Sequence, residues 1–383
     1  MTRRRPESAP AGEPPRAAAE RVALERMAHG GEAVGRAADG RAAFVAGGLP
    51  GESVDVAFVA DRPRFRRGFA AGAPTPRSPD RVEPRCAHFG GWPARGAAPA
   101  AWCGGCHWQH AAIDAQRAFK RATLVDALQR LAGLPAPDVD ATVGGPSSYG
   151  YRNKLRTRLR GGRPGLVAAS GGDVVALDAC PICLPRLWAE VAAFEAELPD
   201  GTEVTFRVGA GTGDALVVVD DRRGLVGEID IDSDASVVVV APDRTLQLAA
   251  GRPFHVERFR GEWIGVPATA FFQVNTEVAE LVADAVAAAL GPGAGRVVDA
   301  CCGIGTLTGA IADVAAEVVA VDIDAVAIAA AVDNLAGRDH VDLVVGDAAE
   351  ALAAVGDGVD AVVVDPPRGG LSTALGSWLA QAG

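Results

Sequence analysis

The alternation of helix and strand after Glu277 is the feature that most constrains the fold of this chain. Short valine-rich runs of strand length are separated by alanine-rich segments of helix length, which is typical of parallel strands covered by helices. Strands are expected at residues 296–300, 317–321, 341–345 and 361–364. The pattern predicts a doubly wound, Rossmann-like α/β domain over residues 269–383.

A paired-glycine turn joins the first of these strands to the next helix. Gly303 and Gly305 allow the backbone to approach a ligand at the carboxyl end of the strand. Gly309 lies one residue too far along for the G-x-G-x-x-G spacing of a dinucleotide-binding turn. S-adenosylmethionine has no pyrophosphate and needs only the glycine pair. The turn therefore favours this methyl donor over a dinucleotide.

An acid ends each of the other three strands. Asp322 is placed to accept hydrogen bonds from ribose hydroxyls, and Asp347 lies where an adenine is expected. The fourth strand ends in Asp365-Pro366-Pro367-Arg368, where two prolines stop the strand and leave the acid at its end. Amino-methylating enzymes use a corresponding motif to hold an amine, so the acid does not define the methyl acceptor.

The front of the chain has a different pattern. Residues 1–20 are rich in Pro, Ala, Arg and Glu and predict a disordered tail. Short alternating segments separated by glycine turns predict a small β-barrel over residues 21–75. A basic cluster with one aromatic residue closes the barrel: Arg62, Arg64, Phe65, Arg66 and Arg67. Such a cluster suits phosphate contact and base stacking, and the alternative is an edge strand protected by arginine.

Charge is distributed unevenly along the chain. The net charge is −11, yet residues 1–165 hold 26 basic and 15 acidic residues. A basic front half on an acidic chain favours a module that binds a polyanion, and drift toward arginine on a solvated surface is the alternative. Residues 1–20 lack the apolar segment of a signal peptide, and no apolar run reaches the length of a membrane span. We therefore expect a soluble, cytoplasmic protein.

The region of residues 80–268 combines a cysteine loop with a mostly β pattern. Cys103-Gly104-Gly105-Cys106 forms a C-x-x-C knuckle, with Cys86 upstream and Cys180 or Cys183 far downstream. Three clustered thiolates and a distant fourth suit an iron–sulfur cluster or a structural zinc ion. The alternative is a loop of thiols that holds no metal.

These segments together resemble the family of RNA uridine C5-methyltransferases, which make 5-methyluridine in ribosomal or transfer RNA. Residues 31–69 look like the family's small TRAM barrel, and Tyr151-Arg152-Asn153-Lys154 looks like the start of its central domain. The most family-specific string is Phe271-Phe272-Gln273-Val274-Asn275. The resemblance covers nearly the whole chain.

The resemblance implies two cofactors, S-adenosylmethionine and a 4Fe–4S cluster. The implied cluster ligands are Cys86, Cys103, Cys106 and Cys180, where Cys180 is preferred to Cys183 because proline follows it. The implied donor pocket consists of Gln273, Cys301 (usually aromatic in the family), Gly303, Gly305, Thr306, Asp322, Asp347 and Asp365. RNA is the implied partner of a monomer, with ribosomal RNA favoured over transfer RNA.

The family activates uracil by adding a cysteine thiolate to C6, and a glutamate later serves as a base. Both residues are expected beyond Gly383, so the sequence is interpreted as a C-terminally truncated member. Its sheet is expected to lack the last strands, and residues 1–383 alone are not expected to methylate RNA. One alternative is a non-catalytic RNA-binding form. Another is an amino-group methyltransferase that uses Asp365-Pro366-Pro367-Arg368.

Overall fold

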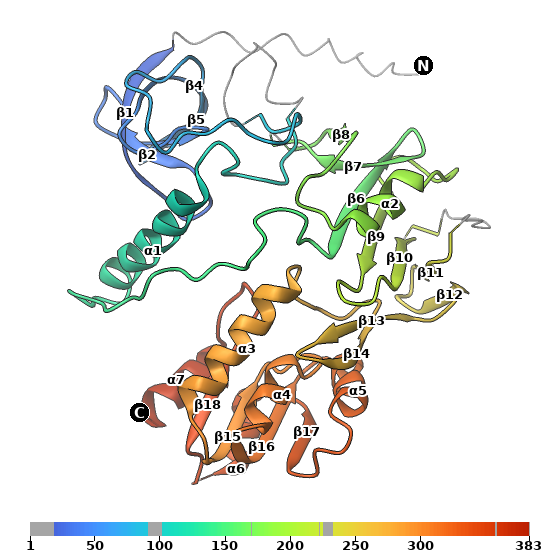
Figure 1. Ribbon diagram of the computed structural model, residues 1–383. Helices are drawn as coiled ribbons and strands as arrows, with labels where there is room; N and C mark the ends of the chain where they lie inside the picture. Colours follow the sequence, from blue (N-terminus) through green and yellow to red (C-terminus); the bar gives the residue numbers. More distant parts are fainter. Residues whose placement is uncertain are drawn as a thin grey trace, which may run out of the picture. The chain divides into compact units, whose positions relative to one another are not determined.

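A computed structural model describes residues 19–90, 102–169, 171–221, 223–224, 233–356 and 358–382 (Figure 1). The predicted tail therefore lies outside the described residues, apart from its last two positions, as does the stretch 91–101 between Cys86 and Cys103. The chain divides into two compact units, Met1–Val143 with Ala168–Asp173 and Gly144–Val167 with Val174–Gly383. Each unit is described by itself.

The first unit contains a closed five-stranded barrel with strand order β1-β2-β3-β5-β4. Alternate residues of β3 and of the first half of β4 fill its interior, as the period of two in the sequence predicts, with Val22, Val45 and Val54 fully buried. Gly68 is required on β5, because a Cβ atom there would lie 2.4 Å from the carbonyl oxygen of Ala57 on β4. The strands are β1 (Glu20–Met27), β2 (Ala33–Arg36), β3 (Ala42–Ala46), β4 (Ser53–Asp61) and β5 (Phe65–Ala70).

After the barrel, a buried ion pair fixes the chain that leads to the cysteine loop. Arg81 donates to both carboxylate oxygens of Glu52, at 2.7 and 2.6 Å, and Glu52 also accepts from the backbone N–H groups of Leu49 and Ser78. Helix α1 (Ile113–Arg130) follows the loop.

The second unit begins with a seven-stranded sheet of order β12-β11-β10-β9-β6-β7-β8. Helix α2 (Pro185–Ala193) packs Leu187 and Val191 against one face of this sheet, together with Leu155 and Phe206. A separate hairpin follows, formed by β13 (Phe254–Phe259) and β14 (Glu262–Pro267). The strands of the sheet are β6 (Lys154–Arg160), β7 (Arg163–Val167), β8 (Val174–Ala176), β9 (Glu203–Val208), β10 (Ala215–Asp220), β11 (Ser236–Val240) and β12 (Leu246–Ala250).

The C-terminal part is a parallel four-stranded sheet of order β17-β16-β15-β18 with helices on both faces (Figure 1). Val297 packs with α3 and α4 on one face, whereas its neighbour Val298 packs with α6 and α7 on the other. β18 forms at the predicted strand 361–364 and lies at one edge of the described sheet. The elements are α3 (Thr276–Leu290), β15 (Ala294–Ala300), α4 (Thr306–Ala312), β16 (Ala315–Asp322), α5 (Ala325–Asn334), β17 (Val341–Val345), α6 (Ala348–Val355), β18 (Ala361–Val364) and α7 (Thr373–Ala382).

The predicted fold class is thus confirmed: a barrel, a β-rich central region and a Rossmann-like α/β domain follow one another along the chain. None of the helices in the described residues has both the length and the apolarity that crossing a bilayer requires.

Candidate active site

The glycine turn lies at the carboxyl edge of the parallel sheet, between β15 and α4. Three of its residues adopt positive φ: Cys301 at 71°, Gly303 at 57° and Gly305 at 87°. A Cβ atom on Gly305 would lie 2.9 Å from the side chain of Leu335 on the neighbouring helix, whereas the space at Gly303 is open. A non-glycine residue with positive φ stores strain, and such strain concentrates at functional sites. The turn is therefore both tightly held and open toward the edge of the sheet.

Asp322, at the end of β16, holds this turn in place. Its Oδ2 accepts from the backbone N–H of Gly303 at 2.8 Å, and its Oδ1 accepts from the N–H of Asp324 at 2.9 Å. Each carboxylate oxygen can accept a second hydrogen bond. Asp322 can therefore bind hydroxyl groups of a ligand while it fixes the glycine turn.

Asp299 is a functional candidate that the sequence analysis did not select. It lies on β15 with 1% of its surface exposed, and its Oδ2 accepts from the Thr308 hydroxyl at 2.6 Å. Oδ1 is buried without a hydrogen-bond partner among the described residues. Burial, with a smaller contribution from the charges of Asp365 and Asp322, raises the pKa of Asp299 to about 7. The acid before the glycines was visible in the sequence, but its burial was not.

The carboxylates of four strands lie along the edge of the sheet next to Cys301, because Ala300 pairs with Val321 and Val364, and Asp322 pairs with Val345. Burial raises the pKa of the Cys301 thiol, and Asp322, Asp299, Asp365 and Asp347 each raise it further. The structure thus brings together four of the predicted pocket residues: Cys301, Asp322, Asp347 and Asp365. A site with this charge suits a cationic ligand, and S-adenosylmethionine carries a sulfonium ion and an ammonium group.

Cys302, the neighbouring thiol, is buried, and its pKa is raised well above the ordinary value by burial and by the charges of Asp299 and Asp322. Both thiols of the turn are therefore protonated near neutral pH. Since the thiolate is the nucleophilic form, neither is suited to attack a substrate.

The remaining predicted pocket residues have different surroundings. Asp347 caps α6 by accepting from the N–H groups of Ala349 and Glu350, at 2.8 and 3.2 Å. Thr306 is the first residue of α4 and is half-buried. The side chain of Gln273 is exposed and has no hydrogen-bond partner within the part of the chain that the structure describes.

A buried polar network holds the segment that contains Gln273. Asn153 Nδ2 donates to the backbone oxygen of Gln273 and to the hydroxyl of Thr276, both at 3.0 Å. The Thr276 hydroxyl in turn donates to Glu257 Oε2 at 2.9 Å. Asn153 and Gln273 belong to the two segments that carried the family resemblance, and the network brings these segments together. Their contact depends on tertiary structure and left no signal in the sequence.

An open hollow of about 530 Å³ lies between α4, α5 and the hairpin and includes Gly305 and Thr306 in its lining. Its rim is closed by Arg260 and Arg338, which pair with Asp313 at 2.8 and 2.7 Å. The converging carboxylates at the carboxyl edge, rather than this hollow, carry the charge expected of a methyl-donor site.

The basic cluster of the barrel proves to be two different pairs of arginines. Arg66 bonds to Glu20 at 2.5 Å, and Arg67 pairs with Glu32 at 2.8 Å. Arg62 and Arg64 are exposed, and neither forms an ion pair within the described residues. Within the described part of the barrel, the positive charge of the second pair is therefore left uncompensated for an external anion.

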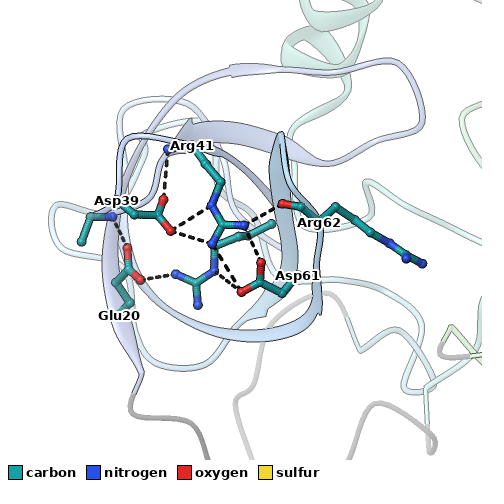
Figure 2. A network of polar contacts seen from close by, with 7 residues as sticks. Glu20, Asp39, Arg41, Asp61 and Arg62 are labelled. Atoms are coloured by element: carbon teal, nitrogen blue, oxygen red, sulfur yellow. Dashed lines mark hydrogen bonds and ion pairs between the residues drawn. The ribbon is translucent and has the colours of Figure 1, made fainter.

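A network of carboxylates neutralises arginine side chains at this end of the barrel. Figure 2 shows Arg41 between Asp39 and Asp61, to which it donates at 2.7 and 2.5 Å, with a further bond to the backbone oxygen of Arg62 at 2.6 Å. Glu20 accepts from the backbone of Ala38 in the same network. These contacts fix the barrel end that carries Arg62.

The cysteines are divided between the two units. Cys86, Cys103 and Cys106 belong to the first unit, and Cys180 and Cys183 to the second. Among the described residues, no three side chains of the metal-binding types form a group that could hold a metal ion. The Cys183 thiol, backbone N–H groups and Arg152 lower the pKa of Cys180 to about 6, which makes Cys180 a ready thiolate donor.

A parallel sheet with a paired-glycine turn and acids at the strand ends is the arrangement of a methyltransferase that uses S-adenosylmethionine. A family model described as a methyltransferase domain matches residues 297–366. The crystal structure of Pyrococcus abyssi tRNA (uracil-54, C5)-methyltransferase in complex with S-adenosyl-L-homocysteine is similar in fold, with a TM-score of 0.65 and 22% identity over 94% of this chain and 87% of that one.

Two curated relatives extend the similarity. An uncharacterized RNA methyltransferase of Thermosynechococcus vestitus is 30% identical over 370 residues, which cover 87% of this chain and 79% of the relative. The 23S rRNA (uracil(1939)-C(5))-methyltransferase RlmD of Chromohalobacter salexigens is 32% identical over 352 residues, which cover 85% of this chain and 71% of the relative. The chain therefore belongs to the RNA (uracil-5-)-methyltransferase family.

Proposed function

We propose that this protein transfers the methyl group of S-adenosylmethionine to C5 of a uridine in RNA. The observation that carries the proposal is the convergence of Asp322, Asp347 and Asp365 at the edge of the sheet, next to the glycine turn. Similarity to RlmD, whose name gives a 23S ribosomal RNA uracil as its substrate, favours ribosomal over transfer RNA.

The proposed donor site uses the residues of the turn and the strand ends. Gly303 and Gly305 give the methionine part of the donor access to the backbone, and Asp322 accepts from the ribose hydroxyls. Asp347 lies beside the adenine, and Asp365 faces the donor or the target base. Gln273 approaches from outside the α/β domain, and Cys301 and Thr306 complete the lining.

The proposed chemistry is covalent, because C5 of uracil is too weak a nucleophile to take a methyl group directly. A thiolate adds to C6, and C5 then takes the methyl group from the sulfonium, which leaves as the neutral thioether S-adenosylhomocysteine. A base removes the C5 proton, and the C6–S bond breaks to return the thiolate. The uridine must leave its stack before it reaches the donor. Cys301 and Cys302 are not proposed as the thiolate, since both are held as thiols.

A 4Fe–4S cluster is proposed at Cys86, Cys103, Cys106 and Cys180. N–H groups already point at two of these sulfurs: Gln109 Nε2 donates to Cys106 at 3.3 Å, and the backbone of Gly105 donates to Cys103 at 3.4 Å. Such donors stabilise the thiolate form that iron requires. The role proposed for the cluster is structural, since it would hold the cysteine loop in place. The residues proposed for the donor site take no part in binding it.

RNA is the proposed partner, and the β-barrel is proposed as a TRAM-like RNA-binding module with Arg62 and Arg64 on its open surface. Domain limits at residues 21–75, 80–268 and 269–383, a monomeric state and a cytoplasmic location complete the proposal.

The experiment is nucleoside analysis after incubation of the protein with unmodified 23S ribosomal RNA and S-adenosylmethionine. We expect 5-methyluridine, and we expect Asp322→Ala to abolish its formation. Unmodified transfer RNA forms the second arm. An N-methylated nucleoside would instead support amino-group methylation through Asp365-Pro366-Pro367-Arg368. RNA binding without any methylated product would support the non-catalytic form.

A further inference from the structure

Two of the 37 basic residues in this chain are lysines, Lys120 and Lys154. Lys154 begins β6 and lies directly opposite Arg207 of β9 in the antiparallel register, so the two side chains share one face of the central sheet. Lys154 is half-buried, and Arg207 is only 4% exposed. Two cations are thus paired across neighbouring strands where like charges repel.

Among the residues that the structure describes, no carboxylate forms an ion pair with either of these two cations. Among those residues, the Lys154 ammonium also has no hydrogen-bond partner. Arg207 donates to the carbonyl oxygens of Pro267 and Ala270, at 3.3 and 2.7 Å, and its Nε is buried without a partner in the described part of the chain. Arg152 adds a third cation whose Nε is likewise unpartnered there.

The nearby acids are committed elsewhere. Glu203 pairs with Arg156 and Arg158, the next two basic residues on the same face of β6. Glu257 is fully buried and accepts from the backbone of Ala210 and Gly211, at 2.8 and 3.0 Å, and from Thr276. The charge of Lys154 and Arg207 therefore remains for an external anion.

The electrostatics agree with this geometry. Burial, followed by the charges of Arg207, Arg156 and Arg152, lowers the pKa of Lys154 to about 8. His255 is 2% exposed, and its pKa is lowered to about 3 by burial and by the charges of Arg207 and Lys154. Buried cations without counter-charge destabilise a fold unless a ligand neutralises them.

We infer that Lys154, backed by Arg207 and Arg152, forms an oxyanion site that takes a backbone phosphate of the RNA. The inference rests on the proposed function, because that function supplies the RNA. Lys154 is accessible enough to contact the phosphate, whereas buried Arg207 acts through its field. Arg207 also holds the carbonyl of Ala270, three residues before Gln273, so the bound phosphate lies beside the segment proposed to touch the methyl donor.

The test is acylation of lysine by an N-hydroxysuccinimide ester near pH 8, with both lysines measured by mass spectrometry. Lys120 is exposed on α1 and serves as the internal reference. One arm contains a short single-stranded oligouridylate, another contains S-adenosylmethionine alone, and RNA binding is measured in parallel by fluorescence anisotropy. We expect the RNA to lower Lys154 modification about tenfold relative to Lys120, because a bound phosphate covers the amine and keeps it protonated.

Each other outcome overturns the inference in a distinct way. Protection by S-adenosylmethionine and not by RNA would assign the site to the donor's carboxylate. RNA that binds while Lys154 stays reactive would remove the phosphate site and leave the proposed function standing. RNA that does not bind at all would overturn both.

A variant gives an independent measurement. Lys154→Met should weaken oligouridylate binding about tenfold and lower the slope of log K against log salt by about 0.7, as expected when one phosphate of a single strand is no longer neutralised. Its melting temperature should be unchanged or higher, because the repulsion with Arg207 is removed. Arg158→Gln, which removes a compensated charge from the same strand, is the matched control. Equal effects of the two substitutions on RNA binding would contradict the site.

Discussion

At the scale of single residues, the candidate site depends on acids whose surroundings give them different tasks. Asp322 is hydrogen-bonded to the turn that it fixes, whereas Asp299 is enclosed beneath the same edge with one oxygen unsatisfied among the described residues. The position of Asp322 at a strand end was predictable from the sequence, because the pattern of apolar runs locates where each strand stops. Their hydrogen bonds were not, since these depend on how neighbouring strands align.

Asp322→Asn should weaken S-adenosylmethionine binding by one to two orders of magnitude, because the substitution removes charge-assisted hydrogen bonds of about 1.5–3 kcal/mol each. Isothermal titration calorimetry measures the change in affinity. Asp342→Asn on the neighbouring strand β17 is the control, since Asp342 is exposed and outside the turn. Similar affinities for the two variants would remove Asp322 from the donor site.

Asp299 should make the stability of the fold depend on pH. Its pKa is about 7 in the folded protein against a usual 3.8, so between these values the folded state keeps a proton that the unfolded chain has released. Stability contributed by this group is therefore present below about pH 4, falls as pH rises toward 7 and is constant above it. Asp299→Asn should remove that dependence, so its melting temperature relative to wild type should rise from pH 4 to pH 8. A difference that does not change with pH would contradict the assignment.

At the scale of elements, the strand–turn–helix unit of β15 and α4 shows what sequence patterns can and cannot supply. The glycine pair in the sequence predicted the turn, and both glycines adopt the positive φ values that glycine tolerates best. The positive φ of Cys301 was not expected, because nothing in its sequence context marks a strained residue. The pairing of β6 with β9, which creates the cation pair at Lys154, likewise joins positions 53 residues apart and has no local signal.

Gly305→Ala should lower the free energy of unfolding by about 1–3 kcal/mol, because alanine is strained at positive φ and its Cβ would meet Leu335. Chemical denaturation measures the change. Gly309→Ala within α4, the helix that Gly305 precedes, is the control, since its Cβ would be in ordinary contact with Leu335 at 3.6 Å and alanine favours a helix. We expect that control to be neutral or stabilising, and the opposite order of the two variants would disprove the role of the turn.

At the scale of the whole molecule, the positive charge that the front half offers to a ligand is smaller than its composition suggests, because ion pairs within the fold neutralise part of it. The basic front half predicted from composition is real, but much of the barrel's positive charge is compensated within the barrel itself, as Figure 2 shows for Arg41. Composition predicts the total charge of a region, whereas the fold decides which charges remain available.

The double variant Arg62→Gln/Arg64→Gln should weaken RNA binding and reduce its salt dependence by about 0.7–0.9 in slope for each phosphate that the protein no longer neutralises. The matched control is Arg21→Gln/Arg26→Gln, which removes two barrel arginines that already pair with Asp55 and Asp126. Fluorescence anisotropy at several salt concentrations measures the RNA affinity and its salt dependence for the two double variants. If the control weakens binding as much, net charge and not the open arginine pair governs affinity.

The hydrogen bonds of Asn153 have a consequence for engineering. The side chain of this residue, which directly precedes β6, binds both the backbone of Gln273 and the hydroxyl of Thr276, over separations of 120 and 123 residues. The central region and the α/β domain are consequently not interchangeable modules. A chimaera that takes these two segments from different relatives keeps this junction only when asparagine and threonine are transferred together.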